Sequence, residues 1–177
     1  MKKMNNKFCF SFCLSLQSGS NKILKKMNRH YTKEIYEESV NMIRGIYSDS
    51  IITTDIIVGF PEETNDDFYE TVDFVKKMKL YNINIFPYSK REGTVAYNNK
   101  SQVDERIKSE RVSILSNEMI KNNKNILDEY FKKPREVLID EKDGIFSIGY
   151  TKEYIKVKTT LNKNIGDFFI YDKKNIC

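Results

Sequence analysis

The chain has 177 residues, 40% of them hydrophobic and 31% charged, which is the composition of a soluble globular protein and excludes a disordered chain. Its net charge of +5 is uneven, because residues 1–33 hold eight of the 30 basic residues and none of the 25 acidic ones. A basic end favours nucleic acid through counterion release, but a solvated basic segment is the competing interpretation. No apolar run reaches the roughly 18 residues that a membrane span needs.

The first residues resemble a secretion signal, with Lys2, Lys3 and Lys7 ahead of the apolar run FCFSFCLSL. Two serines and two cysteines within that run, and the absence of a small-x-small cleavage site, argue against this interpretation. Three cysteines, an odd number, fit a reducing compartment better than a disulfide framework. We therefore expect a cytoplasmic protein.

The first half of the chain alternates strand and helix patterns. The run IITTDIIVG is rich in β-branched residues and nearly continuous in apolar character, which is typical of a parallel strand buried on both faces. Thr32 is a plausible N-cap, and Thr64 and Asp67 have capping-box spacing. The predicted strands cover residues 13–16, 51–59 and 82–88, and the predicted helices begin near residues 21, 32 and 64.

The second half changes period after a boundary at Pro134. Residues 104–131 predict a long polar helix, and four short period-two segments follow it within residues 135–140, 144–151, 154–160 and 165–172. The expected fold class is α/β, with parallel β/α units and right-handed crossovers followed by a small all-β module. The expected domains are an α/β domain over residues 13–133 and an all-β domain over residues 134–177, with residues 1–12 left unmatched.

Ligands of parallel sheets bind at the carboxyl ends of the strands, which places residues 17–19, 59–61 and 88–91 on one candidate rim. Asp55 lies inside an apolar strand, where a buried carboxylate needs a partner and so suggests a functional role. Three parallel strands cannot close a barrel and leave an apolar edge exposed, so we expect further strands before residue 13.

Three stretches closely resemble the radical-SAM methylthiotransferases that modify tRNA: LSLQSGSNKILKKMNRHYT, TTDIIVGFPEET and FPYSKREGT, in the family's order and spacing. The segment GYTKEYIKV resembles the family's TRAM module, a small OB-like β-barrel that binds RNA. The subgroup that the chain resembles most acts on threonylcarbamoyladenosine beside the anticodon. The resemblance implies half of a radical-SAM β/α barrel followed by a TRAM barrel, with tRNA as the partner and S-adenosylmethionine as the cofactor.

The resemblance also implies cofactor-binding residues on the rim, namely Gln17, Ser18, Arg29, Asp55, Ile57 and Gly59. In this hypothesis Arg29 pairs with the carboxylate of S-adenosylmethionine, and Asp55 and Gln17 bond its ribose hydroxyls. Ile57 and the turn at Gly59 receive the adenine. The alternatives are a surface charge at Arg29 and a plain strand-ending turn at Gly59.

In the last module, Tyr150, Lys152, Tyr154 and Lys156 interleave aromatic and basic side chains. Such side chains on an OB-like barrel stack on bases and contact phosphates, so these four residues are the candidate RNA-binding set. The competing interpretation is a barrel whose aromatic residues form its core. His30, the only histidine, is interpreted as an exposed helix-flanking residue.

The cysteines depart from the family, in which a Cys-x-x-x-Cys-x-x-Cys run holds an iron–sulfur cluster. Cys9 and Cys13 have the first spacing, but Leu16 stands where the third ligand would be. We therefore predict no metal ligands and no catalytic residues, and expect a C-terminal fragment that lacks the cluster domain and is inactive alone. A separate polypeptide carrying that domain is one potential partner. The alternatives are a non-catalytic RNA-binding protein and a non-functional gene remnant.

Overall fold

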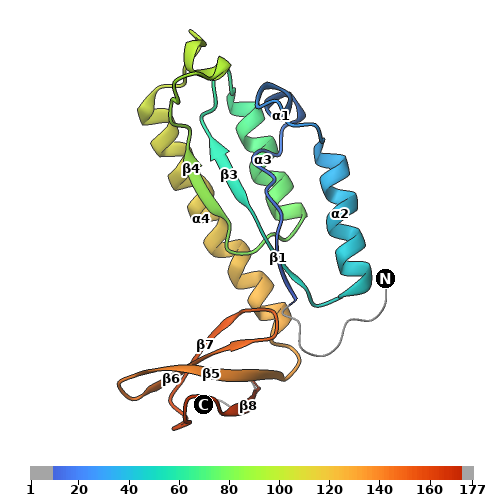
Figure 1. Cartoon of the computed structure of the whole chain (residues 1–177), viewed down its shortest axis with the longest axis vertical. Helices are drawn as coiled ribbons and strands as arrows, with labels where there is room; N and C mark the ends of the chain where they lie inside the picture. Colours follow the sequence, from blue (N-terminus) through green and yellow to red (C-terminus); the bar gives the residue numbers. More distant parts are fainter. Residues whose placement is uncertain (1–9, 173–177) are drawn as a thin grey trace.

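The computed structural model describes residues 10–172. Figure 1 shows an α/β part above a smaller antiparallel sheet, with the long helix α4 (Glu105–Tyr130) running down the first part and ending at the second. No helix within the described residues is long and apolar enough to cross a membrane. The order of elements follows the strand–helix alternation and the later all-β segment that the sequence predicts.

Parallel strands form the centre of the α/β part. β1 (Ser11–Cys13) pairs with β2 (Ile51–Thr53), and β3 (Asp55–Val58) pairs with β4 (Asn84–Pro87). A parallel bridge between Gln17 and Ile56 joins the two pairs. Between β2 and β3, the Oγ1 atom of Thr54 accepts a hydrogen bond from the backbone N of Leu16 at 2.8 Å. The predicted parallel arrangement is confirmed, although the first strand covers residues 11–13 and not 13–16, and the predicted strand 51–59 is interrupted at Thr54.

The α-helices begin where the sequence predicts, and the structure adds a 3₁₀ turn that was not predicted. They are α1 (Asn21–Lys26), α2 (Lys33–Ile46), α3 (Asn65–Lys77), the 3₁₀ turn η1 (Val95–Asn98) and α4. Thr32 accepts a hydrogen bond from the N–H of Ile35, and Thr64 and Asp67 form a complete capping box. Capping therefore fixes the start of α2 and α3 locally, before any tertiary contact is considered.

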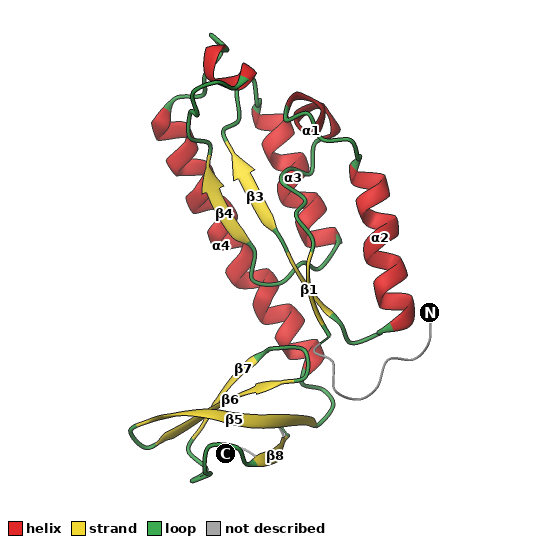
Figure 2. Cartoon of the chain, viewed as in Figure 1, coloured by secondary structure: helices red, strands yellow, loops and turns green. Residues whose placement is uncertain are grey.

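The sheet is covered by helices on one face, as the burial of the central strand shows. Ile52, Ile56 and Val58 are fully buried in the main core with side chains of α2, α3 and α4, whereas Thr53 and Ile57, which point to the other face, are only half-buried. Figure 2 shows α2, α3 and α4 alongside the strands. The prediction of a strand buried on both faces was therefore wrong for the described chain.

The segment that follows β1 is held by two tyrosines. The hydroxyl of Tyr36 donates to the carbonyl of Leu14 at 3.0 Å, and the hydroxyl of Tyr31 lies 3.0 Å and 3.1 Å from the carbonyls of Ser15 and Leu16. These bonds satisfy carbonyl groups that an unpaired strand would otherwise leave to water or to another chain. The edge is thus less open than the sequence suggests.

The second part is a four-stranded antiparallel sheet in the order β7-β6-β5-β8. Its strands are β5 (Arg135–Asp143), β6 (Phe146–Thr151), β7 (Lys156–Thr159) and β8 (Phe168–Tyr171), which confirms the four predicted segments. Val137, Ile139, Val157 and Phe169 form its small core. Closure into a TRAM barrel stays a prediction.

A mixed interface joins the two parts. Ile51 packs with Tyr130 and Ile155, and the Tyr130 hydroxyl donates to the carboxylate of Glu153. Arg135 stacks its guanidinium 3.9 Å from the centroid of the Tyr130 ring, and its Nη1 atom donates to Asp49 at 2.8 Å. The end of α4 therefore holds the antiparallel sheet against the α/β part.

Candidate functional site

The carboxyl ends of the three parallel strands lie together, as the sequence predicts. The backbone N of Ile57 donates to the carbonyl of Gln17 at 2.9 Å, and that of Tyr88 donates to the carbonyl of Val58 at 2.8 Å. The rings of Phe60 and Tyr88 meet edge to face with centroids 5.0 Å apart. These contacts place the three predicted turns on one rim.

The uncovered face of the sheet carries two of the predicted cofactor residues, and the backbone of a third is bonded to the same strand. Ile57 and Asp55 point to this face of the central strand, and Gln17 is bonded to the same stretch through its backbone. Gln17 has a φ of 68°, a conformation that non-glycine residues adopt rarely, and its side chain makes no hydrogen bond within the described chain. Gln17 is therefore a buried residue in an uncommon backbone conformation whose side-chain amide has no hydrogen-bond partner in the described chain.

Asp55 differs from its predicted environment. Its carboxylate is half-buried, not buried, and it accepts a hydrogen bond from the side-chain amide of Asn84 at 2.9 Å. Asn84 is the residue opposite Asp55 in the parallel register. Sequence reasoning missed Asn84, although the alternation in NINIF places residues 82, 84 and 86 on one strand face.

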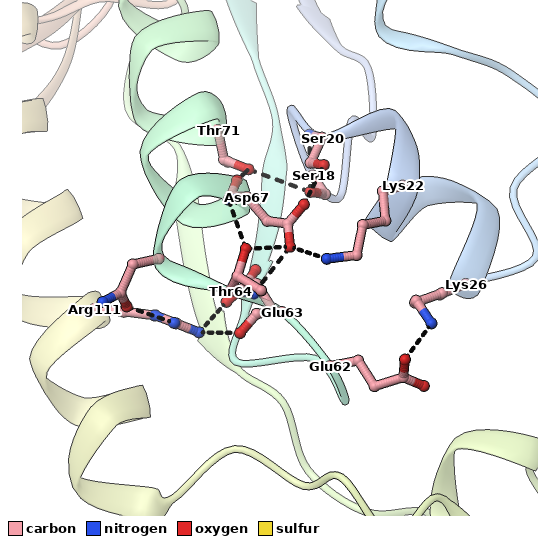
Figure 3. A network of polar contacts seen from close by, with 11 residues as sticks. Ser18, Ser20, Lys22, Lys26, Glu62, Glu63, Thr64, Asp67, Thr71 and Arg111 are labelled. Carbon is pink, nitrogen blue, oxygen red and sulfur yellow. Dashed lines mark hydrogen bonds and ion pairs between the residues drawn. The ribbon is translucent and has the colours of Figure 1, made fainter.

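Ser18 is fully buried in a polar network that holds α1 against α3 (Figure 3). Its Oγ atom lies 3.2 Å from the Oγ1 of Thr71 and accepts a hydrogen bond from the backbone N of Ser20 at 3.1 Å. The hydroxyl is therefore engaged in shaping the turn, and its contact with a cofactor stays a prediction.

Asp67 lies at the centre of the same network. Its carboxylate accepts hydrogen bonds from Lys22 Nζ at 2.6 Å, Ser20 Oγ at 2.9 Å, and the Thr64 hydroxyl and backbone N at 2.7 Å and 2.9 Å. Although burial opposes the charged form, these donors, with Lys22 the strongest, lower the pKa of Asp67 to about 2. Asp67 is thus ionised in the folded protein, and its negative charge is stabilised by the neighbouring donors.

A buried ion pair supports the turn after β3. Arg111 Nη1 donates to Glu63 Oε2 at 2.7 Å, and the same oxygen accepts the backbone N of Gly59 at 2.6 Å. Both charged side chains are almost inaccessible to solvent, and burial raises the pKa of Glu63 while Gly59 and Arg111 oppose the shift. Figure 3 shows this pair beside the Asp67 network.

Gly59 is required by packing. Its φ is +72°, and a Cβ added there would lie 2.3 Å from Cγ of Lys108. Lys108 is only 2% exposed, and its Nζ donates to the Tyr88 carbonyl at 3.0 Å and to Glu105 at 2.7 Å. The lysine stem therefore fills the space that the glycine leaves, and contact of Gly59 with adenine stays a prediction.

Arg29 is not brought into contact with the other candidates. It is exposed in the connection between α1 and α2, its backbone N donates to Leu24, and its side chain has no hydrogen bond or ion pair to a described residue. His30 is exposed beside it, as expected. The role of Arg29 toward a carboxylate remains a prediction.

The four candidate RNA-binding residues lie close together on the antiparallel sheet. The rings of Tyr150 and Tyr154 stack with centroids 4.7 Å apart and an interplanar angle of 16°. Tyr154 is 64% exposed, Lys156 pairs in register with Tyr150, and Lys152 is exposed next to the turn. The pair therefore consists of one exposed and one half-buried ring flanked by lysines and lies outside the core of the sheet, and its contact with RNA stays a prediction.

The described residues do not fit an iron–sulfur cluster. Within residues 10–172 no group of three or more His, Cys, Asp or Glu side chains is placed to hold a metal ion, and Cys13 is a free, exposed thiol. Cys9 and Cys177 lie outside the described range. The polar groups near β3 fit S-adenosylmethionine better, because the Asp55 carboxylate accepts hydrogen bonds and the Gln17 amide both donates and accepts them.

Comparison with known proteins gives the class: residues 1–75 match the model of the Radical SAM superfamily. The matched range includes residues 1–12, which the sequence motifs leave unmatched. A half-covered parallel sheet with polar groups at its strand ends agrees with that class.

The similarity to individual curated proteins is more specific than the superfamily match. The chain is 45% identical over 145 residues to the tRNA-2-methylthio-N(6)-dimethylallyladenosine synthase of Thermosipho africanus, a match that covers 80% of this chain and 34% of the relative. It is 43% identical over 155 residues to the threonylcarbamoyladenosine tRNA methylthiotransferase of Aquifex aeolicus, covering 88% and 37%, and 38% identical over 150 residues to that of Bacillus subtilis, covering 81% and 33%. The chain is a relative of the radical-SAM tRNA methylthiotransferases and spans about a third of their length.

Proposed function

We propose that this chain is part of an enzyme that transfers a methylthio group to carbon 2 of a modified adenosine beside the anticodon of tRNA. The observation that carries the proposal is the grouping of Gln17, Asp55 and Ile57, in which the backbone of Gln17 bonds the strand whose Asp55 and Ile57 side chains face the uncovered side of the sheet. The relatives' names support tRNA as the substrate. We place this activity in the cytoplasm.

S-adenosylmethionine supplies the methyl group and the radical chemistry when it is bound. Among the residues of this chain, Asp55 accepts hydrogen bonds from the ribose hydroxyls while Asn84 fixes its carboxylate. The Gln17 amide bonds the same sugar, and Arg29 pairs with the carboxylate of the cofactor. Ile57 gives the adenine an apolar surface.

A calorimetric titration of S-adenosylmethionine into the chain tests this site. We expect Asp55→Ala to weaken binding by about tenfold to a hundredfold, because it removes a charged acceptor worth roughly 1.5–3 kcal/mol. Asp66→Ala, which removes an exposed carboxylate in the first turn of α3, should leave the affinity unchanged. Equal affinities of the Asp55 and Asp66 variants, or no binding by the wild type, would overturn the assignment.

The substituent on the adenosine is proposed to be threonylcarbamoyl, from the motif resemblance. The relatives carry both substrate names, dimethylallyladenosine and threonylcarbamoyladenosine. Comparing the affinity of the chain for two tRNAs that differ only in this modification distinguishes the two substrate classes. Tighter binding of the dimethylallyl form would assign the chain to the other branch.

We further propose that the chain alone does not cleave S-adenosylmethionine reductively. The support is the cysteine spacing, since Leu16 occupies the third position of the cluster run begun by Cys9 and Cys13. The chain should yield no 5′-deoxyadenosine after reconstitution with iron and sulfide. Product above a no-protein control would refute this.

A second candidate function, favoured by the exposed Tyr150–Tyr154 stack, is RNA binding without catalysis. Base stacking on an aromatic side chain contributes roughly 1–3 kcal/mol, so Tyr154→Ala should weaken tRNA binding by about fivefold to a hundredfold. This candidate predicts strong salt-dependent tRNA binding together with no affinity for S-adenosylmethionine.

A further inference from the structure

Glu62 ties two rim segments together. Its carboxylate accepts from Lys26 Nζ of α1 at 2.6 Å and from Asn99 Nδ2 of the connection between β4 and α4 at 2.8 Å. Its backbone N also donates to the carbonyl of Ser101 at 3.0 Å, and its φ is +66°, an uncommon conformation for a non-glycine residue. Figure 3 shows the contact with Lys26. The end of α1 and the loop after β4 therefore share one rim.

The loop after β4 is held in one conformation by its own polar groups. Gln102 Nε2 donates to the carbonyls of Ala96 at 2.9 Å and Asn99 at 2.7 Å. Thr94 Oγ1 donates to the carbonyl of Arg91 at 2.7 Å. An exposed loop ordered in this way presents its charged side chains at fixed positions, so a ligand need not order it on binding.

Four cations on these segments have no ion pair with a described residue: Lys25, Lys90, Arg91 and Lys100. The neighbouring acids are largely engaged, since Glu62, Asp67 and Glu63 pair with Lys26, Lys22 and Arg111. Glu92 and Asp66 are exposed acids nearby that form no ion pair within the described chain, so the surplus charge of these groups is positive. All four cations are exposed.

We propose that these four residues, the rim cations, bind phosphates of the RNA whose base is presented to the strand ends. The inference rests on the proposed function, because it takes the rim as the place where the RNA substrate is positioned. Unpaired exposed cations gain the most from phosphate, since binding releases condensed counterions and breaks no existing ion pair.

Figure 1 shows α1 and the loop after β4 at one end of the molecule and the antiparallel sheet, whose β6 carries Tyr150, at the other end. Helix α4 runs between the two ends, and its 26 residues correspond to about 39 Å at 1.5 Å per residue. An RNA that contacts both surfaces must span a similar distance. The structure therefore favours a folded RNA such as a whole tRNA over a short oligonucleotide.

Titration of tRNA into the chain at several salt concentrations tests the proposal. In the variant Lys25→Gln/Lys90→Gln/Arg91→Gln/Lys100→Gln, we expect the slope of log affinity against log salt to fall by about 3, since each phosphate contact contributes roughly 0.7–0.9. The dissociation constant should rise more than tenfold. The control Lys76→Gln/Lys77→Gln, on the last turn of α3, should stay within twofold.

The outcomes distinguish a failure of the rim-cation proposal from a failure of the proposed function. If the wild type binds tRNA and the rim variant keeps its slope and its dissociation constant within twofold, the rim proposal is overturned and the proposed function stands. If the wild type binds no tRNA at low salt, both are overturned. A measurement on the wild type is independent of variant folding: tRNA should protect Lys25, Lys90 and Lys100 from acetylation, and unchanged acetylation would refute the rim contact.

Discussion

Replacing Gly59 by alanine should destabilise the protein through two separable effects. The residue has a φ of +72°, where a Cβ costs roughly 1–2 kcal/mol. The added Cβ would also lie 2.3 Å from Cγ of Lys108, a stem whose ammonium group is held by the Tyr88 carbonyl and Glu105. Displacing such a packed side chain costs roughly 1–3 kcal/mol, so the free energy of unfolding should fall by about 2–5 kcal/mol.

Gly93 is the matched control, since its φ is +79° and nothing lies within 4 Å of a methyl group added there. Gly93→Ala should therefore cost only the conformational part, roughly 1–2 kcal/mol. Urea unfolding followed by circular dichroism gives both values. If Gly59→Ala and Gly93→Ala differ by less than about 0.5 kcal/mol, contact with Lys108 is not what requires the glycine, and the explanation of this turn fails.

Three further predictions concern charged and polar contacts. Because the pKa of Asp67 falls from 3.8 to about 2 on folding, ionised Asp67 stabilises the protein above pH 4. The free energy of unfolding should therefore decrease by roughly 2 kcal/mol as the pH drops toward 2. Urea unfolding of Asp67→Asn at several acidic pH values should not show this decrease. Arg111→Leu leaves the Glu63 carboxylate buried without its partner and should cost roughly 3–5 kcal/mol, whereas a cost below 1 kcal/mol in the same assay would show that the pair is unimportant. Tyr130→Phe removes the donor to the buried Glu153 and should cost roughly 1–3 kcal/mol by thermal unfolding; no change in melting temperature would contradict this account of the interface.

Local signals predict the elements well, because their causes are local. The capping box at Thr64 and Asp67 and the N-cap Thr32 mark helix starts within a few residues, and both are present. The rim at the strand ends follows from parallel pairing alone. The period-two segments after Pro134 likewise become strands, because alternation reflects which side chains face the small core.

The contacts that the sequence does not reveal are those set by tertiary packing. Lys108 lies in a polar helix and looks solvent-exposed, yet a glycine 49 positions earlier leaves room for its stem. Glu62 joins two segments whose proximity no local pattern indicates. The strand of Asp55 suggests burial on both faces because its apolar residues dominate, and only the sheet shows that one face has no covering helix.

Helix α4 carries Lys108 and Arg111 near its start and Tyr130 at its end, so one continuous rod contacts the rim and the antiparallel sheet. A helix turns about 100° and advances about 1.5 Å with each residue. Inserting a single residue in its exposed middle would therefore swing the antiparallel sheet around the rod by about 100° and break the Tyr130–Glu153 contact. The number of residues in α4 thus sets the orientation of the antiparallel sheet relative to the α/β part. Helix α4 should therefore tolerate substitutions on its exposed side far better than insertions.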